Sequence, residues 1–110
     1  VKAYIRTHEI RNTVEALQDA DAPGITVVEV HPVGYGFEPN YFEPSSKDPI
    51  QPYPKITKLE IVCNDEDVDR FVQIISGASY TGSRGDGMIF VTDIEQAIKI
   101  KSGERGESAL

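Results

Sequence analysis

Residues 56–77 have the sequence ITKLEIVCNDEDVDRFVQIISG, and this stretch decides the fold. Apolar and polar side chains alternate over residues 56–63, which predicts a strand with one buried face. Asn64 and the three acidic residues after it favour the N-terminus of a helix. The apolar face of that helix consists of Val68, Phe71, Val72 and Ile75. We expect the Ser-Gly pair at 76–77 to end the helix, so the stretch predicts a strand–helix unit.

A similar unit precedes this one. Residues 2–6 are expected to form a strand, and Asn12 with Glu15 matches a capping box at the start of the following helix. The apolar face of that helix is formed by Ile10, Val14 and Leu17. The Pro-Gly pair at 23–24 ends the helix, and the β-branched run ITVVEV, residues 25–30, predicts the next strand.

The C-terminal part completes the pattern. MIFVT, residues 88–92, predicts a strand, and we expect a helical turn over 93–97 and a brief strand over 98–101. The order β-α-β, long loop, β-α-β predicts an α+β fold, a ferredoxin-like βαββαβ sandwich. The chain of 110 residues would form a single domain, 1–110, with a polar and mobile tail at 102–110.

The charge balance excludes some classes of partner. Lys and Arg number 11 and Asp and Glu 18, so the net charge is −7 at pH 7. Binding to nucleic acid depends on cations that neutralise phosphates, and binding to anionic lipid needs a basic surface. We therefore expect no nucleic-acid partner and no binding to a lipid surface.

The reactive residue types are sparse. Cys63 is the single cysteine, which excludes a disulfide framework within the chain, and we expect its side chain in the core. His8 and His31 lack metal-ligand spacing, so no metal site is expected. No nucleophile with a base, and no carboxylate pair, has a catalytic spacing, so we expect no catalytic residues. The sequence shows no leader and no membrane span, and a cytoplasmic location is the expectation.

Residues 34–54 form the longest stretch without a pattern of its own. Five prolines occur in it: Pro39, Pro44, Pro49, Pro52 and Pro54. A loop of this length in a small domain is typically functional or disordered.

Three features favour a phosphate ligand. The loop TGSRGDG, residues 81–87, carries three glycines, whose backbone N–H groups are able to approach an anion closely. Lys99 and Lys101 alternate with isoleucines and so share one face. Gly34 and Gly36 directly precede the long loop. Each feature taken alone has a structural alternative: a connecting turn, a solvated strand face or a flexible loop entry.

Together these features resemble the PII nitrogen-regulatory signal proteins. The most specific stretch is TGSRGDGMIFVTDIEQAIKIKSGERGESAL, residues 81–110, and the segments EAL, GITV and KLEIV support it. The resemblance implies three named loops: a T-loop at 34–54, a B-loop at 81–87, and a C-loop with tail at 99–110. It also implies a homotrimer that binds ATP, ADP or AMP in clefts between subunits.

The resemblance assigns roles to particular positions. Backbone amides of the B-loop would wrap the phosphates, both lysines would reach them, one or both from the adjacent subunit, and two strand residues would lie near the adenine. The implied nucleotide-binding residues are Thr26, Gly34, Gly36, Glu60, Gly85, Asp86, Gly87, Lys99 and Lys101. The implied partner-binding residues in the T-loop are Tyr41, Phe42, Ser45, Ser46 and Lys47.

Several positions depart from the family pattern. Met88 stands where a basic residue commonly follows GDG, and lysines replace two arginines, so ADP or AMP is expected to compete well with ATP. Glu38 replaces a glutamine that helps to hold magnesium and 2-oxoglutarate, and Ile56 replaces a lysine that pairs with 2-oxoglutarate. These two changes predict a poor 2-oxoglutarate site and leave magnesium open.

The resemblance therefore favours a nucleotide-responsive regulator that is not an enzyme and that acts on a transporter or enzyme through its T-loop. Recruitment to a membrane transporter fits this role. Tyr41 and Tyr53 lack the sequence around the tyrosine that the family modifies. The alternatives are a regulator of inorganic-carbon uptake that responds to bicarbonate, a slow nucleotide hydrolase using Glu38 or Asp86, and a trimeric metal-tolerance protein of related fold.

Overall fold

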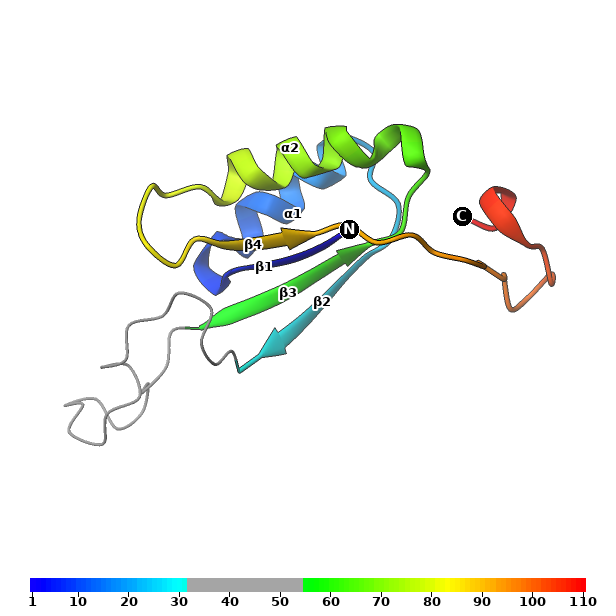
Figure 1. The fold of residues 1–110 in the computed structure, drawn as a ribbon, viewed down its shortest axis with the longest axis horizontal. Coiled ribbons are helices and arrows are strands. Elements are labelled where there is room, and N and C mark those ends of the chain that lie inside the picture. Colours follow the sequence, from blue (N-terminus) through cyan, green and yellow to red (C-terminus); the bar gives the residue numbers. More distant parts are fainter. Residues whose placement is uncertain (32–54) are drawn as a thin grey trace.

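The computed structural model describes residues 1–31 and 55–110 (Figure 1). The helices and strands are β1 Lys2–Arg6, α1 Ile10–Asp19, β2 Ile25–Val30, β3 Ile56–Ile61, α2 Val68–Ser79 and β4 Gly87–Phe90. The strands form one antiparallel sheet in the order β2-β3-β1-β4, and both helices cover the same face of it. This is the predicted α+β arrangement with βαββαβ order.

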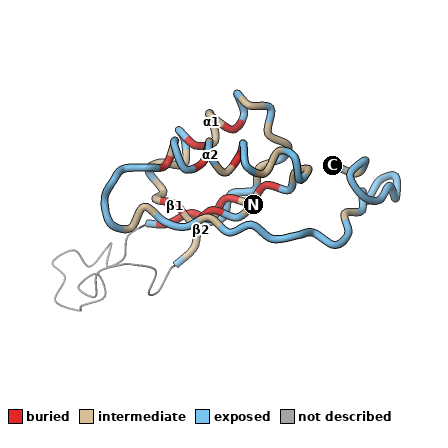
Figure 2. Tube along the Cα trace, turned by 45° about the horizontal axis from the view of Figure 1, so that its top comes forward, coloured by how far each residue is buried: buried red, intermediate tan, exposed pale blue. Residues whose placement is uncertain are grey.

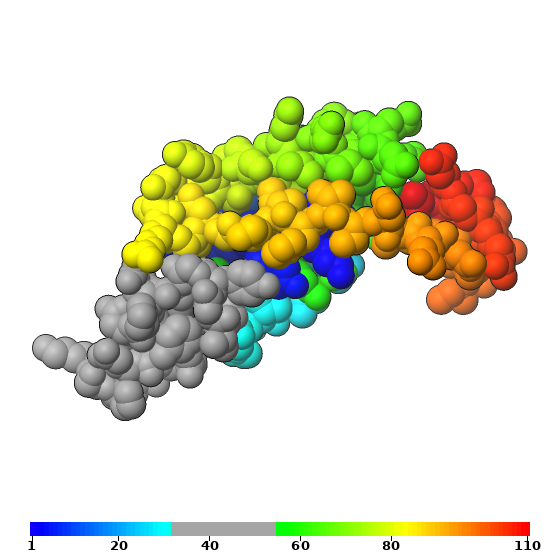
Figure 3. All heavy atoms as spheres, in the orientation of Figure 1, coloured from blue at the N-terminus to red at the C-terminus, as the bar shows by residue number. Residues whose placement is uncertain are grey.

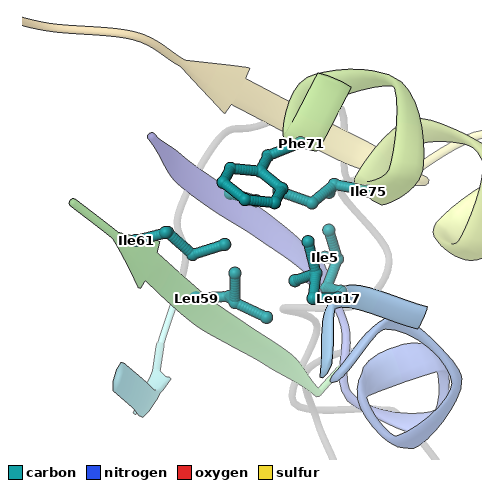
Figure 4. Packing of buried hydrophobic residues seen from close by; sticks show 7 residues of the cluster. Ile5, Leu17, Leu59, Ile61, Phe71 and Ile75 are labelled. Atoms are coloured by element: carbon teal, nitrogen blue, oxygen red, sulfur yellow. The ribbon is translucent and has the colours of Figure 1, made fainter. Parts of the chain in front are cut away.

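The hydrophobic core lies between the sheet and the two helices (Figure 4). Its fully buried members, none more than 1% exposed, are Ala3, Ile5, Leu17, Leu59, Ile61, Phe71 and Ile75. The helical and alternating patterns in the sequence predicted most of these positions. Thr13 is a buried position that they missed, and its hydroxyl donates to the carbonyl of Glu9 at 2.8 Å, which satisfies the buried polar group.

Both helices differ at their ends from the prediction. A 3-10 turn at Thr7–Glu9 leads directly into α1, so Asn12 lies inside the helix and caps nothing. Likewise α2 continues past Ser76-Gly77 to Ser79, whose hydroxyl donates to the carbonyl of Ile75 at 2.6 Å. Packing against the sheet carries the helix through a glycine that local propensity predicts as its end.

The C-terminal segment, residues 91–110 and here called the C-terminal arm, differs most from the prediction. Residues 93–97 form no helical turn, and residues 98–101 form no strand but a single bridge between Ile98 and Arg105. Hydrogen bonds from Lys99 N to Glu104 O and back from Gly103 N to Lys99 O, both 2.8 Å, close a tight hairpin. The alternating pattern of residues 98–101 is typical of a strand. These residues form no strand because no other strand in the described part of the chain lies beside them.

The arm leaves the end of β4 and runs away from the sheet (Figures 1 and 3). Except for Ala97 and Ala109, every residue of the arm is exposed (Figure 2). The tail predicted to be mobile contains a 3-10 turn at Gly106–Ala109. No helix among the described residues has the length and hydropathy needed to cross a bilayer.

Candidate functional site

The glycine-rich loop, residues 81–87, joins α2 to β4. Its three glycines, Gly82, Gly85 and Gly87, have φ angles of 80°, 90° and 114°. Backbone in this region is easily adopted only by glycine. The three glycines therefore permit the tight turn, and the Ser83 N–H donates to the Thr81 hydroxyl at 3.1 Å within it.

Asp86 holds this loop together from inside. Its carboxylate accepts hydrogen bonds from the Thr81 hydroxyl, from Thr81 N at 2.9 Å and from Gly82 N at 3.0 Å. These bonds, the Thr81 hydroxyl foremost, lower the pKa of Asp86 from 3.8 to about 2. The side chain of Asp86 therefore holds the start of the loop against its end.

Arg6 at the end of β1 also contacts the loop, and sequence reasoning missed it. Its Nε lies 3.4 Å from Asp86 Oδ1, and its Nη2 donates to the backbone carbonyl of Arg84. The arginine and the aspartate are 80 residues apart in the sequence. No local pattern indicates this pairing, because only the alignment of β1 beside β4 brings the two residues together.

Gly87 is required at the start of β4 for a second reason. An added Cβ would lie 1.8 Å from the carbonyl oxygen of Tyr4 on β1. Only glycine permits the two backbones to approach this closely. The end of the loop therefore lies directly against the backbone of β1 at Tyr4.

Thr26 and Glu60 are directly opposite each other on β2 and β3, on the face of the sheet away from the helices. Glu60 also lies opposite Lys2 of β1 and forms an ion pair with Lys58 at 3.0 Å. This hydrogen-bonded pair lowers the pKa of Glu60 and raises that of Lys58. Both carry their charges at neutral pH, and together they give this part of the open face a polar surface.

The strand register separates the predicted site residues into two groups. Gly87 lies opposite Ile5, whereas Glu60 lies opposite Lys2, so they are offset by three residues, or about 10 Å, along β1. The first group, here called the loop half-site, consists of Gly85, Asp86 and Gly87. The second group, the arm half-site, combines Thr26 and Glu60 of the sheet with Lys99 and Lys101, which lie on the C-terminal arm outside the strand register.

The two lysines lie still farther from the loop. Lys99 and Lys101 are exposed on the C-terminal arm, beyond the end of the sheet opposite to the glycine-rich loop (Figures 1 and 3). A phosphate held by the loop amides and by these lysines would need both within hydrogen-bond distance. One copy of the described chain does not provide that arrangement.

A cleft lies between the C-terminal arm and the end of β3. Its volume is about 220 Å³, and its walls mix apolar side chains such as Val62 and Ile94 with the carboxylates of Asp93 and Glu107. The volume is below the range of about 300–1,000 Å³ that is usual for small-molecule sites. Cys63, expected in the core, lines this cleft half-buried, and burial raises the pKa of its thiol.

Several predicted residues fall in 32–54, outside the described part of the chain. These are Gly34, Gly36, Glu38, Tyr41, Phe42, Ser45, Ser46 and Lys47. Ile56, at the position expected to weaken a 2-oxoglutarate site, is described and is 3% exposed. In residues 1–31 and 55–110, no group of three or more His, Cys, Asp or Glu side chains is arranged to hold a metal ion.

Comparison with known proteins gives a consistent result. The family model described as Nitrogen regulatory protein P-II matches residues 1–104. A nitrogen regulatory protein P-II of Rhodobacter capsulatus is 40% identical, over 100% of this chain and 97% of its own length. The nitrogen regulatory protein GlnK of Escherichia coli K12 is 33% identical, with the same coverage of both chains.

A solved structure shares the fold. The crystal structure of Arabidopsis thaliana PII bound to citrate superposes with a TM-score of 0.77 and 29% sequence identity. The match covers 99% of this chain and 88% of that one. The similarity therefore extends across the glycine-rich loop and the C-terminal arm.

Proposed function

This chain belongs to the family of P-II nitrogen regulatory proteins, and from that premise we propose that it is a nucleotide-responsive regulator. It binds an adenine nucleotide, ADP, AMP or ATP, between subunits of a homotrimer. It transmits the bound state to a transporter or enzyme and has no turnover of its own. Each site combines the loop half-site of one subunit with the arm half-site of the next.

The observation that supports this proposal is the separation of the two half-sites within one chain. The loop amides and the lysines lie at opposite ends of the sheet (Figure 1). A cyclic trimer places the arm of one copy beside the loop of another, so that the two half-sites meet. A ligand that bridges them stabilises the assembly, because it binds only the assembled form.

Exposed apolar side chains on the arm support a partner of the same sequence. Ile94 is 56% exposed, Ile98 50% and Ile100 fully exposed. Apolar side chains on an extended arm are stabilised when another surface covers them, by about 1.5–3 kcal/mol for full burial of each. A second copy of this chain is the surface that brings a loop half-site to the lysines.

The side chains around the site favour short phosphate chains. Met88, directly after the loop, is 51% exposed and brings no charge. Lys99 and Lys101 each supply a point charge, without the forked geometry by which arginine holds two phosphate oxygens. ADP and AMP should therefore compete with ATP, and magnesium would bind through the nucleotide phosphates.

Regulation of the target is assigned to residues 34–54. Among these, Tyr41, Phe42, Ser45, Ser46 and Lys47 are the proposed contacts. A ligand at Gly34 and Gly36 would select one arrangement of this segment, and the target would bind that arrangement. A cytoplasmic protein that is recruited to a membrane transporter fits this mode of action.

The test is a calorimetric titration of the purified protein with AMP, ADP and ATP, each with and without 2-oxoglutarate, bicarbonate and citrate. We expect one nucleotide per subunit and no effect of 2-oxoglutarate. An effect of bicarbonate would assign the protein to inorganic-carbon regulation. Steady ATP turnover would contradict the regulatory assignment, and the absence of any nucleotide binding would overturn the proposed site.

A mixing experiment tests whether each site spans two chains. The variant Lys99→Ala/Lys101→Ala lacks the arm half-site, and Asp86→Ala lacks an ordered loop. Neither should bind nucleotide alone. A random equimolar mixture should regain about a quarter of its sites, because in each mixed trimer one interface of three joins an intact loop to an intact arm. No recovery in trimers of verified mixed composition would contradict a site shared between subunits.

A further inference from the structure

We propose that Arg6 is a positioning residue for the phosphates of the bound nucleotide: it fixes the glycine-rich loop and makes its charge favourable for an anion. This inference rests on the proposed function, since it concerns the same site. Arg6 lies on β1, outside every motif that pointed to nucleotide binding. The argument rests on its contacts, on the charge of the loop and on a matched arginine elsewhere in the chain.

The contacts of Arg6 join the loop to the sheet at two points. Nε meets the Asp86 carboxylate at 3.4 Å, and Nη2 donates to the carbonyl of Arg84. Both partners lie in the part of the loop whose amides would face the phosphates. Because β1 lies between β3 and β4, Arg6 joins this part of the loop to a central strand of the sheet (Figure 1).

The contact to the Arg84 carbonyl also affects which backbone groups face the ligand. A carbonyl oxygen repels a phosphate, whereas an N–H group attracts it. By accepting from Arg6, the Arg84 carbonyl is held toward β1. The N–H of Gly85 belongs to the same planar trans peptide unit, so it points in the direction opposite to that carbonyl.

The charge of the loop requires a cation from elsewhere. Residues 81–87 contain Arg84 and Asp86 as their charged side chains, so the loop itself is neutral. The next residue, Met88, adds no charge. Arg6 brings the cluster to a net charge of +1 and offsets the Asp86 carboxylate, which would otherwise repel a polyphosphate at short range.

The positions of these side chains make the charge effective. Arg6 is 22% exposed and Asp86 24%, so water screens the pair less than it screens fully exposed charges. The guanidinium has five N–H donors in a fixed fork. Contacts to one carboxylate and one carbonyl leave donor capacity that a phosphate oxygen is able to use.

Another arginine in the chain provides a matched control. Arg70 on α2 also joins an aspartate, with Nη2 3.2 Å from Asp67 Oδ1, and also donates to a backbone carbonyl, that of Ala20 at 2.7 Å. It lies at the other end of α2 from the glycine-rich loop. Replacing Arg70 therefore removes the same charge and the same kinds of hydrogen bond, together with its contact over the Phe71 ring at 4.6 Å, without touching either half-site.

The experiment compares Arg6→Gln, Arg6→Lys and Arg70→Gln with the unaltered protein by titration with AMP, ADP and ATP. For Arg6→Gln we expect the Kd of ATP to rise about tenfold and that of AMP less than twofold. The loss should grow with the number of phosphates. Arg6→Lys, which keeps the charge but not the fork, should lie between, and Arg70→Gln should bind normally.

The dependence on phosphate number tests whether Arg6 acts at the phosphates, and an equal loss of affinity for AMP, ADP and ATP would overturn the inference. The intermediate affinity expected of Arg6→Lys, which keeps the charge, separates this role from a loss of the loop's fold. Normal binding by Arg6→Gln would also overturn it and leave the proposed function standing. If the unaltered protein binds no nucleotide, both fail together. Thermal unfolding and the oligomeric state of each variant show whether Arg6→Gln folds. If Arg6→Gln does not fold, the nucleotide affinities of Arg6→Lys test the inference.

Discussion

The packed body of this protein, here residues 1–31 and 55–90, and its C-terminal arm contain similar apolar residues. The two regions place these residues in opposite environments. In the body, Phe71 and Ile75 of α2 are at most 1% exposed. On the arm, Ile98 is 50% exposed and Ile100 fully exposed. The sequence marks both regions as apolar, yet only the body finds partners for these side chains within the described chain.

The difference shows that a hydrophobic pattern specifies a face to be covered and not the surface that covers it. In the body, a sheet and two helices cover one another, which gives a core independent of other chains. On the arm, Ile98 and Ile100 have no covering surface within the described chain, and the proposed assembly would supply one from a second chain.

The largest expected effect on the free energy of unfolding comes from a substitution in the hydrophobic core of the body. Phe71→Ala removes the largest buried side chain and should lower the free energy of unfolding by about 3–5 kcal/mol. Urea unfolding at a fixed protein concentration measures this. The control Gln73→Ala, on an exposed position of the same helix, should stay within about 0.5 kcal/mol. Equal effects of both changes would contradict the core assignment.

The next comparison uses two glycines of the body. Gly87→Ala places a Cβ against the Tyr4 carbonyl at a φ of 114° and should destabilise the protein by about 2–4 kcal/mol. Gly77→Ala, inside α2 with no atom within 4 Å of the added Cβ, should stabilise it by about 0.5–1 kcal/mol. Thermal unfolding of the two variants should therefore shift in opposite directions, and a shared sign would contradict the close approach at Gly87.

A change on the arm should leave the body intact. Ile100→Ser should alter unfolding of the dissociated chain by less than about 0.5 kcal/mol. Under the proposed assembly it should weaken the trimer by about 1.5–3 kcal/mol per subunit, since the isoleucine is then buried. Sedimentation over a range of concentrations measures this, with Thr92→Ala as an exposed control on the same arm. An unchanged trimer would show that Ile100 is not in the interface.

The smallest expected effect concerns pH and the loop. The pKa of Asp86 is lowered from 3.8 to about 2, so its charged form stabilises the fold. That contribution is complete above about pH 5 and is lost as the pH falls through 3.8 toward 2. The stability gap between the unaltered protein and Asp86→Asn should therefore shrink over this range. Thr81→Val, which removes the largest cause of the shift, should reproduce part of the loss, whereas a gap constant with pH would contradict the hydrogen-bonded carboxylate.

Most of the fold was predictable because its signals are local. Alternation over residues 56–61 and the helical spacing of Phe71 and Ile75 are properties of neighbouring residues, and the structure confirms both. The errors arose where a local signal competed with packing. Local propensity predicts a helix end at Gly77, which lies within α2, and residues 98–101 have a strand pattern without a strand partner in the described chain.

The site was predictable only in part. The positive φ angles of Gly82, Gly85 and Gly87 follow from the residue type, and their role in a tight loop was expected. The contact of Arg6 with Asp86 was not, because 80 residues separate them and neither belongs to a pattern that includes the other. The family resemblance identified Asp86 as a site residue, but it gave no role to Arg6, which contacts Asp86.

By itself, the sequence determined the order of the elements, the residues that face the core and the one loop whose glycines allow an unusual backbone. These depend on φ and ψ preferences and on side-chain periodicity, which are set within a few residues. Only the tertiary structure decided that the loop and the lysines lie at opposite ends of the sheet, and that Arg6 reaches the loop. Antiparallel pairing of β1 with β4 brings Arg6 to the loop, and such pairing depends on the packing of distant segments. The lysines lie beyond the other end because the arm follows β4 and forms its bridge within itself.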